Sequence, residues 1–159
     1  SAWFNEGVAL ESLGRGEEAK ARYVQALTRA PAYSPALNNL AALHLKEGRL
    51  ADARAGFERA VSADPKNADA HANLALALAG TADPDAALAH VAVALQHKPH
   101  LQIGMTPLVW LLAAHPEPAA RRPAEARRLA ERIVAATRRA ATDATTIANG
   151  MGSPPHTPT

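Results

Sequence analysis

Residues 35–66 read PALNNLAALHLKEGRLADARAGFERAVSADPK and contain one full copy of a pattern that recurs along the chain. Near the end of this copy stands Pro65, and prolines lie 34 residues to either side of it, at Pro31 and Pro99. The segments 1–32, 35–66 and 69–100 correspond position by position. A period of 34 residues is typical of stacked helical hairpins, in which each unit buries its apolar face against its neighbours.

Each copy contains two runs of small and apolar residues at spacings of 3 and 4, which place them on one face of a helix. Gly48 ends the first run of the middle copy, as Gly14 does in the preceding one, where a left-handed residue suits a helix end. The prolines stop the second helix. Alanine, the best helix former, supplies 40 of the 159 residues. The sequence predicts an all-α fold, a right-handed α-solenoid of stacked antiparallel helix hairpins.

This arrangement resembles the tetratricopeptide repeat family over residues 1–100. The first copy carries the resemblance at Trp3, Gly7, Leu10, Ala19, Tyr23, Ala26 and Pro31. Three positions depart from the family: Glu6 stands where it usually has leucine, and His44 and His71 where it has a large apolar or aromatic residue. We expect these departures to weaken single contacts and the two histidines to be partly buried.

The 34-residue frame also predicts the boundaries of the units. We expect repeats at 1–33, 34–67 and 68–101, a degenerate fourth repeat at 102–141 with a five-residue loop insertion, a partial helix of a fifth repeat at 142–151, and a proline-rich, non-helical tail at 152–159. The chain begins inside the expected first helix, so we expect it to be either a processed product or a piece of a longer protein.

The resemblance implies that first helices line a concave groove and that this groove holds a protein or peptide. The candidate partner-binding residues are the first-helix positions not used in packing, namely Phe4, Asn5, Val8, Asn38, Asn39, Ala42, Lys46, Asp69 and Asn73.

Asn5, Asn39 and Asn73 recur with the 34-residue period. Asparagine costs about 0.5 kcal/mol relative to alanine in a helix interior, but its amide offers both a donor and an acceptor to a peptide backbone. Similar asparagine ladders line the grooves of tetratricopeptide superhelices attached to protein O-glycosyltransferases. The alternative is that each asparagine caps or bridges neighbouring helices, or persists from duplication.

The sequence contains no recognisable catalytic set, cofactor site or metal site. It has no cysteine, and its seven histidines are not accompanied by an HExxH pattern or a carboxylate cluster. We therefore expect a non-enzyme without a cofactor, whose histidines lie at surfaces or interfaces.

Charge is concentrated near the C-terminus, where Arg121, Arg128, Arg132 and Arg139 share one helix face. This face is either simply solvated or docks onto an acidic protein or an anionic membrane surface. Nucleic acid is disfavoured because no stacking aromatics accompany the arginines. No stretch approaches the ~20 apolar residues of a membrane span, so a soluble, cytoplasmic or peripheral membrane location stays open, as does the oligomeric state.

The leading functional hypothesis is a non-catalytic protein–protein interaction scaffold that binds a peptide or subunit in its groove. Two alternatives stay open. One is a structural subunit of a larger, membrane-bound or soluble assembly, docked by convex faces and the tail. The other is a targeting segment of a larger enzyme such as a glycosyltransferase.

Overall fold

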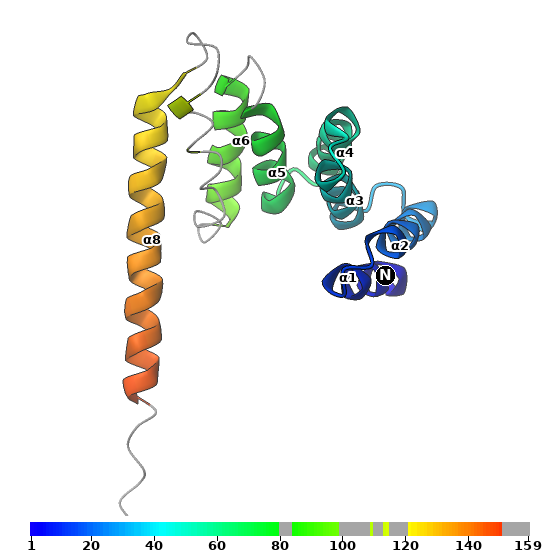
Figure 1. Ribbon diagram of the computed structural model, residues 1–159, viewed down its shortest axis with the longest axis horizontal. Helices are drawn as coiled ribbons and strands as arrows, with labels where there is room; N and C mark the ends of the chain where they lie inside the picture. The colour runs from blue at the N-terminus through cyan, green and yellow to red at the C-terminus, as the bar shows by residue number, and fades with distance from the viewer. Residues whose placement is uncertain (80–83, 99–108, 110–112, 115–120, 151–159) are drawn as a thin grey trace, which may run out of the picture.

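The computed structural model describes residues 1–79, 84–98, 109, 113–114 and 121–150, and all regular secondary structure in these residues is helical. The helices are α1 (Ala2–Ser12), α2 (Gly16–Arg29), α3 (Ser34–Lys46), α4 (Leu50–Ala63), α5 (Ala68–Ala79), α6 (Pro84–His97) and α8 (Pro123–Gly150). Figure 1 shows the first six as successive hairpins and α8 as a long helix beside α6. The prediction of an all-α fold is confirmed.

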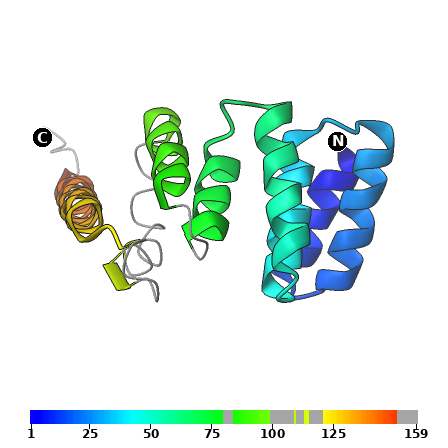
Figure 2. The same cartoon turned by 90° about the horizontal axis from the view of Figure 1, so that it is seen from above.

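The hairpins stack in chain order. Helices α1 and α2, α3 and α4, and α5 and α6 pack as antiparallel pairs, and α2 then packs on α3 as α4 packs on α5 (Figure 2). The first helices α3 and α5 also contact each other, whereas the described second helices have no comparable contact among themselves. First helices therefore lie on the inner side of the stack, and the fold is the expected helical solenoid.

Glycine and proline set the helix ends as expected. Gly14 and Gly48 follow α1 and α3 with φ angles of +73° and +76°, in the left-handed region that favours glycine. The second helices end at Arg29, Ala63 and His97, each two residues before a repeat proline. The 34-residue period thus appears directly in the chain's turns.

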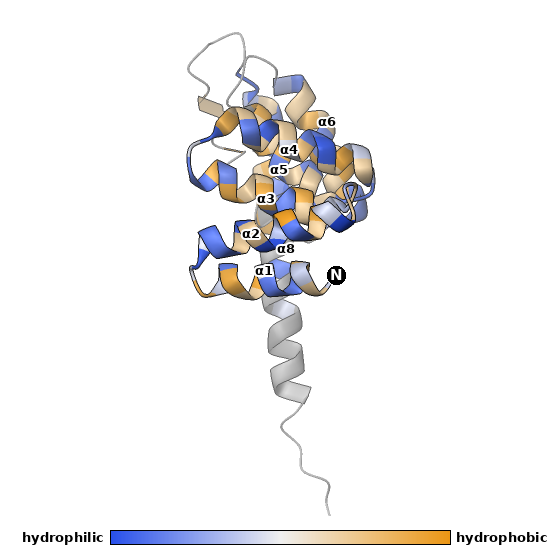
Figure 3. Ribbon diagram, turned by 90° about the vertical axis from the view of Figure 1, so that its right-hand side faces the viewer, coloured by the Kyte–Doolittle hydropathy of each residue, from blue (hydrophilic) through white to orange (hydrophobic). Residues whose placement is uncertain are grey.

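Figure 3 shows hydrophobic and hydrophilic stretches alternating along the helices of the hairpins. The hairpins are held by large side chains that fill space left by small ones. Tyr23 of α2 and Phe57 of α4 are the largest fully buried side chains and lie one period apart. A Cβ atom added to Gly7 would come within 2.5 Å of the Tyr23 ring, so this close approach requires glycine. In the next hairpin, a Cβ atom on Gly56 would lie 2.7 Å from Cβ of Ala41.

Helix α8 differs from the predicted division of the C-terminal part. We expected a repeat boundary between 141 and 142, but α8 continues without a break from Pro123 to Gly150. The reason lies in the sequence, which has neither glycine nor proline between Ala124 and Asn149. Most of the loop with the expected insertion, and the tail 152–159, lie outside the described residues. None of the described helices combines the length and apolar character needed to cross a bilayer.

Two glycine-to-alanine substitutions, one at the close contact of α3 and α4 and one at an open position of α2, should change the free energy of unfolding in opposite directions. Gly56→Ala gains about 1 kcal/mol of helix propensity but forces a contact with Ala41 that costs about 1–3 kcal/mol, so we expect a lower free energy of unfolding. Gly16→Ala, whose new Cβ would meet nothing closer than 4.0 Å, should raise it by up to about 1 kcal/mol. Urea denaturation of both variants measures the difference. An equal gain in both would show that the α3–α4 contact is loose.

Candidate functional site

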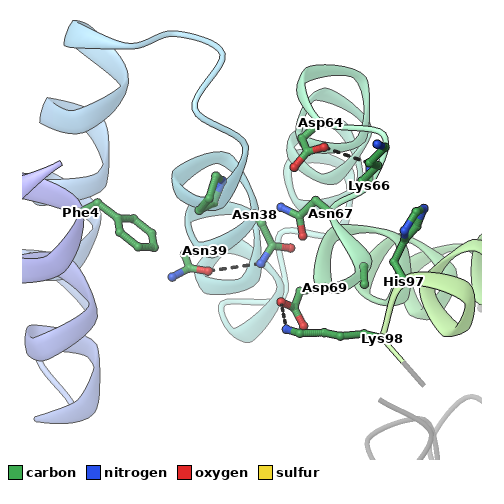
Figure 4. Close-up of a pocket in the computed structure, with 11 residues that line it drawn as sticks. Phe4, Asn38, Asn39, Asp64, Lys66, Asn67, Asp69, His97 and Lys98 are labelled. Carbon is green, nitrogen blue, oxygen red and sulfur yellow. Dashed lines mark hydrogen bonds and ion pairs between the residues drawn. The ribbon is translucent and has the colours of Figure 1, made fainter. Parts of the chain in front are cut away.

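The inner side of the stack carries a hollow of about 400 Å³ between α1, α3 and the end of α6 (Figure 4). Its lining combines one aromatic ring, several amides and charges of both signs. The lining residues are Phe4, Pro35, Asn38, Asn39, Asp64, Lys66, Asn67, Ala68, Asp69, His97 and Lys98.

Four of the candidate residues from the sequence line this hollow: Phe4, Asn38, Asn39 and Asp69. The other five lie elsewhere along the first helices. Asn5 and Val8 are exposed on α1, Ala42 and Asn73 are half-buried on α3 and α5, and Lys46 is exposed at the end of α3.

A chain of amide hydrogen bonds connects the asparagines. Asn73 Nδ2 donates to Asn38 Oδ1 at 2.9 Å, and Asn38 Nδ2 donates to Asn39 Oδ1 at 3.2 Å. Asn39 Nδ2 in turn donates to the hydroxyl of Tyr23 at 3.2 Å. Asn38, only 7% exposed, is therefore the buried link through which α5, α3 and α2 are joined.

Tyr23 extends this chain to α1. Its hydroxyl donates to Glu11 Oε2 at 3.0 Å, and Glu11 Oε1 accepts from Lys46 Nζ at 2.6 Å. Burial, with a further contribution from Glu11, raises the pKa of Tyr23 to about 12, so the phenol stays a neutral donor at physiological pH. The hydrogen-bond network thus runs from Asn73 on α5 through α3, α2 and α1 and returns to α3 at Lys46.

The network leaves hydrogen-bonding capacity unused. An asparagine amide has two N–H donors and a carbonyl with two lone pairs. Asn73 uses one donor, and Asn39 uses one donor and one lone pair, so each keeps a donor and an acceptor among the described contacts. The side chain of Asn5 makes no hydrogen bond with a described residue. Asn39 and Asn73 therefore bridge helices and still present free polar groups, whereas Asn5 bridges nothing among the described residues.

Sequence reasoning missed the side chains contributed by turns. Lys66 and Asn67 come from the turn before α5, while His97 and Lys98 come from the end of α6. The period offered a signal, because Asp64 and Lys98 stand one repeat apart and each precedes a repeat proline. Asn67 is also structural: its Oδ1 accepts from the Ala70 amide at 3.0 Å and caps α5.

The hollow is close to electrically balanced. Asp69 forms an ion pair with Lys98, with Nζ 2.6 Å from Oδ2. The Asp64 carboxylate accepts a hydrogen bond from the backbone N–H of Lys66 at 3.0 Å. The lining thus carries two carboxylates, Asp64 and Asp69, and two ammonium groups, Lys66 and Lys98, a balance that does not select a strongly charged ligand. Amides and one aromatic ring are better suited to a neutral, extended chain.

A histidine pair joins α5 and α6 outside the hollow. His71 Nε2 lies 3.1 Å from the carbonyl oxygen of Pro65, which can only accept, so that nitrogen carries the proton. His71 Nδ1 then accepts, and His90 Nδ1 donates to it across 2.9 Å. Within the described part of the chain no three His, Cys, Asp or Glu side chains gather to hold a metal.

The repeat frame could have revealed this pair. Positions 71 and 90 correspond to Trp3 and Arg22 in the first hairpin, where the guanidinium lies 5.2 Å from the Trp3 ring centre. His71 is nearly fully buried and His90 half-buried. Burial, with repulsion from His71, lowers the pKa of His90, although Glu58 opposes the shift.

The histidine pair predicts a pH-dependent stability. Because the folded-state pKa of His90 lies below the ordinary value of 6.5, its contribution is complete above 6.5 and is lost as the pH falls through the folded value. His90→Gln should therefore reduce the loss of unfolding free energy between about pH 7.5 and 5. His97→Gln, an exposed position on the same helix, is the control. Identical pH profiles for both variants and the parent would refute the assignment.

Comparisons with known proteins support the fold and the repeats. No curated protein sequence matches the chain. In solved structures 56 chains match, and one is a variant of the O-GlcNAc transferase of Thermobaculum terrenum, at a TM-score of 0.64 and 26% identity. That match covers 76% of this chain but 24% of the transferase chain, so this chain spans about a quarter of it.

The family comparison agrees with the repeat frame. Residues 1–33 match the tetratricopeptide repeat, and residues 45–115 match it again, so that more than half of the chain is covered. The stacked hairpins and the glycine-ended first helices belong to the same pattern. The chain is a member of the tetratricopeptide repeat family.

Proposed function

We propose that the chain is a non-catalytic interaction module that holds an extended segment of a partner protein along the groove formed by α1, α3 and α5. The bound segment would run past Asn5, Asn39 and Asn73 and would reach the hollow between Phe4 and Lys98. A protein-binding role is the usual one for tetratricopeptide repeats.

The observation that carries the proposal is the asparagine network with its unused groups. Asn38 holds the amides of Asn39 and Asn73 through hydrogen bonds of 3.2 and 2.9 Å, so their orientation is set before any ligand arrives. Each keeps one donor and one acceptor, which matches the N–H and C=O of a peptide unit. Preorganised amides bind a backbone at a smaller entropic cost than free side chains do.

The hollow adds one side-chain subsite to this backbone recognition. The Phe4 ring packs edge-on against Tyr33, with ring centres 5.3 Å apart, and still lines the hollow. Its apolar face accommodates one uncharged side chain of the bound segment. The balanced charges around Asp69 and Lys98 favour a segment without a block of like charges.

The test uses peptides selected on the parent protein from a displayed library of short random sequences. Asn39→Ala combined with Asn73→Ala should weaken their binding by about tenfold or more, because two backbone contacts of about 1 kcal/mol each are lost. Gln25→Ala, which removes an exposed amide from α2, should leave binding unchanged.

Circular dichroism and fluorescence anisotropy give the required readouts. The double variant should keep its helix content while its affinity falls. Selected peptides that bind the double variant as tightly as the parent would remove the groove from the proposal.

The likeness to the Thermobaculum terrenum transferase supports a second candidate, a substrate-targeting segment of a larger glycosyltransferase. Here the groove would hold the protein that is modified. The sequence of the gene on both sides of this segment decides it: a sugar-transferase domain in the same reading frame is expected, and its absence would eliminate this candidate.

A further inference from the structure

A second hollow lies between α6 and α8, away from the asparagine groove. It has a volume of about 180 Å³, and its apolar floor is formed by Leu88, Val91 and Ala92 of α6 together with Leu129 of α8. Glu125, Arg128 and Arg132 complete its lining from the α8 side. We call it the α6–α8 groove.

The walls of the α6–α8 groove are held in place at one end of α8. Ala126 and Leu129 are buried in the same core cluster as Val91 and Ala94. Arg122, directly before α8, donates two hydrogen bonds to Asp85 at the start of α6, with distances of 3.0 and 2.9 Å. This bidentate pair joins the start of α8 to the last hairpin, beside the buried contacts of Ala126 and Leu129.

Unpaired arginines border the α6–α8 groove. Arg128 and Arg132 are exposed one helical turn apart, and neither side chain makes an ion pair or hydrogen bond with any residue that the structure describes. Arg127, on another side of α8, is instead neutralised by Glu131 at 2.9 Å. Arg139 lies two turns beyond Arg132 on the same face. Two cations thus border the α6–α8 groove beside Glu125, and Arg139 continues the same face of α8 beyond it.

We propose that the α6–α8 groove docks an acidic amphipathic helix of a partner protein. Apolar side chains of that helix fill the floor at Leu88 and Leu129, and carboxylates at its edge pair with Arg128 and Arg132. An amphipathic helix binds by laying its apolar face into an apolar groove, for which Leu88 and Leu129 form the floor, and Arg128 at the edge attracts carboxylates. The site is separate from the peptide groove of the proposed function and does not depend on it.

Charge and composition argue against other occupants. A second copy related by two-fold symmetry at this groove would bring α8 against α8, and residues 121–150 hold seven arginines against three acidic residues, so the copies would repel. A membrane surface is disfavoured because this segment has no tryptophan, tyrosine or phenylalanine to anchor in the interface. The same lack of aromatics disfavours single-stranded nucleic acid.

The probe is a fluorescent synthetic helix with leucine at heptad positions a and d and glutamate at e and g, titrated into the full chain and followed by anisotropy. A peptide of the same composition with its leucines redistributed is the control. The amphipathic probe should bind and the redistributed one should not. No binding by the amphipathic probe, or equal binding by both, would overturn the proposal.

Charge reversals locate the contact. Arg128→Glu and Arg132→Glu should each weaken probe binding by about tenfold. Arg138→Glu makes the same change in net charge at an exposed position about 100° around the helix, and it should have little effect. Ala92→Glu, which places a carboxylate beside the arginines from the α6 side, should also block the probe.

Three results would contradict the proposal. An equal loss in all three arginine variants would indicate unspecific attraction. If the chain sediments with phosphatidylserine vesicles and Arg128→Glu abolishes this sedimentation, the surface binds a membrane instead. Concentration-dependent dimers that Arg128→Glu disrupts would identify a second copy. Helix content, measured by circular dichroism, should be the same in every variant.

Discussion

Close contact between a small residue of the first helix and a large ring of the second holds each of the first two hairpins together. Tyr23 occupies the space that the missing side chain of Gly7 leaves open, and fully buried Phe57, 34 residues later, lies in the same core cluster as Ala41. Burying rings of this size removes well over 100 Å² of surface from water each and supplies much of the stability of a unit this small. The groove exists because these contacts hold the first helices on the inner side.

Polar contacts add specificity between hairpins. Ser34 Oγ donates to the Ala60 carbonyl at 2.8 Å and accepts from Asn67 at 2.7 Å, while Asn73 joins Asn38 across α5 and α3. Each such bond contributes about 0.5–1.5 kcal/mol net, less than the rings contribute. Their greater effect is on geometry, because a buried amide without its partner would cost more than the bond gives.

The sequence was sufficient to predict the hairpins and many of their ends, since period, glycine and proline act locally. We could assign Gly14 and Gly48 to helix ends without knowing which helices pack around them. The hydrogen-bond network could not be predicted from the sequence, because the direction in which an amide side chain points depends on the partners around it in the folded structure. Asn39 and Asn73 were recognised from their spacing, but their connection through Asn38 required the packed helices. We placed a repeat boundary inside α8 because we extended the 34-residue frame into residues 124–149, which contain no glycine or proline to end a helix.

The anchoring of α8 has a consequence for multivalent recognition. Arg122 and Asp85, together with the buried Ala126 and Leu129, join this helix to the same stack that carries the asparagines, so one chain presents both surfaces. A partner that offers both an extended stretch and an acidic helix would bind the second surface intramolecularly, at an effective concentration in the millimolar range when its linker is short. Two individually weak contacts would then combine into a long-lived complex, and the linker length of the partner would determine which proteins qualify.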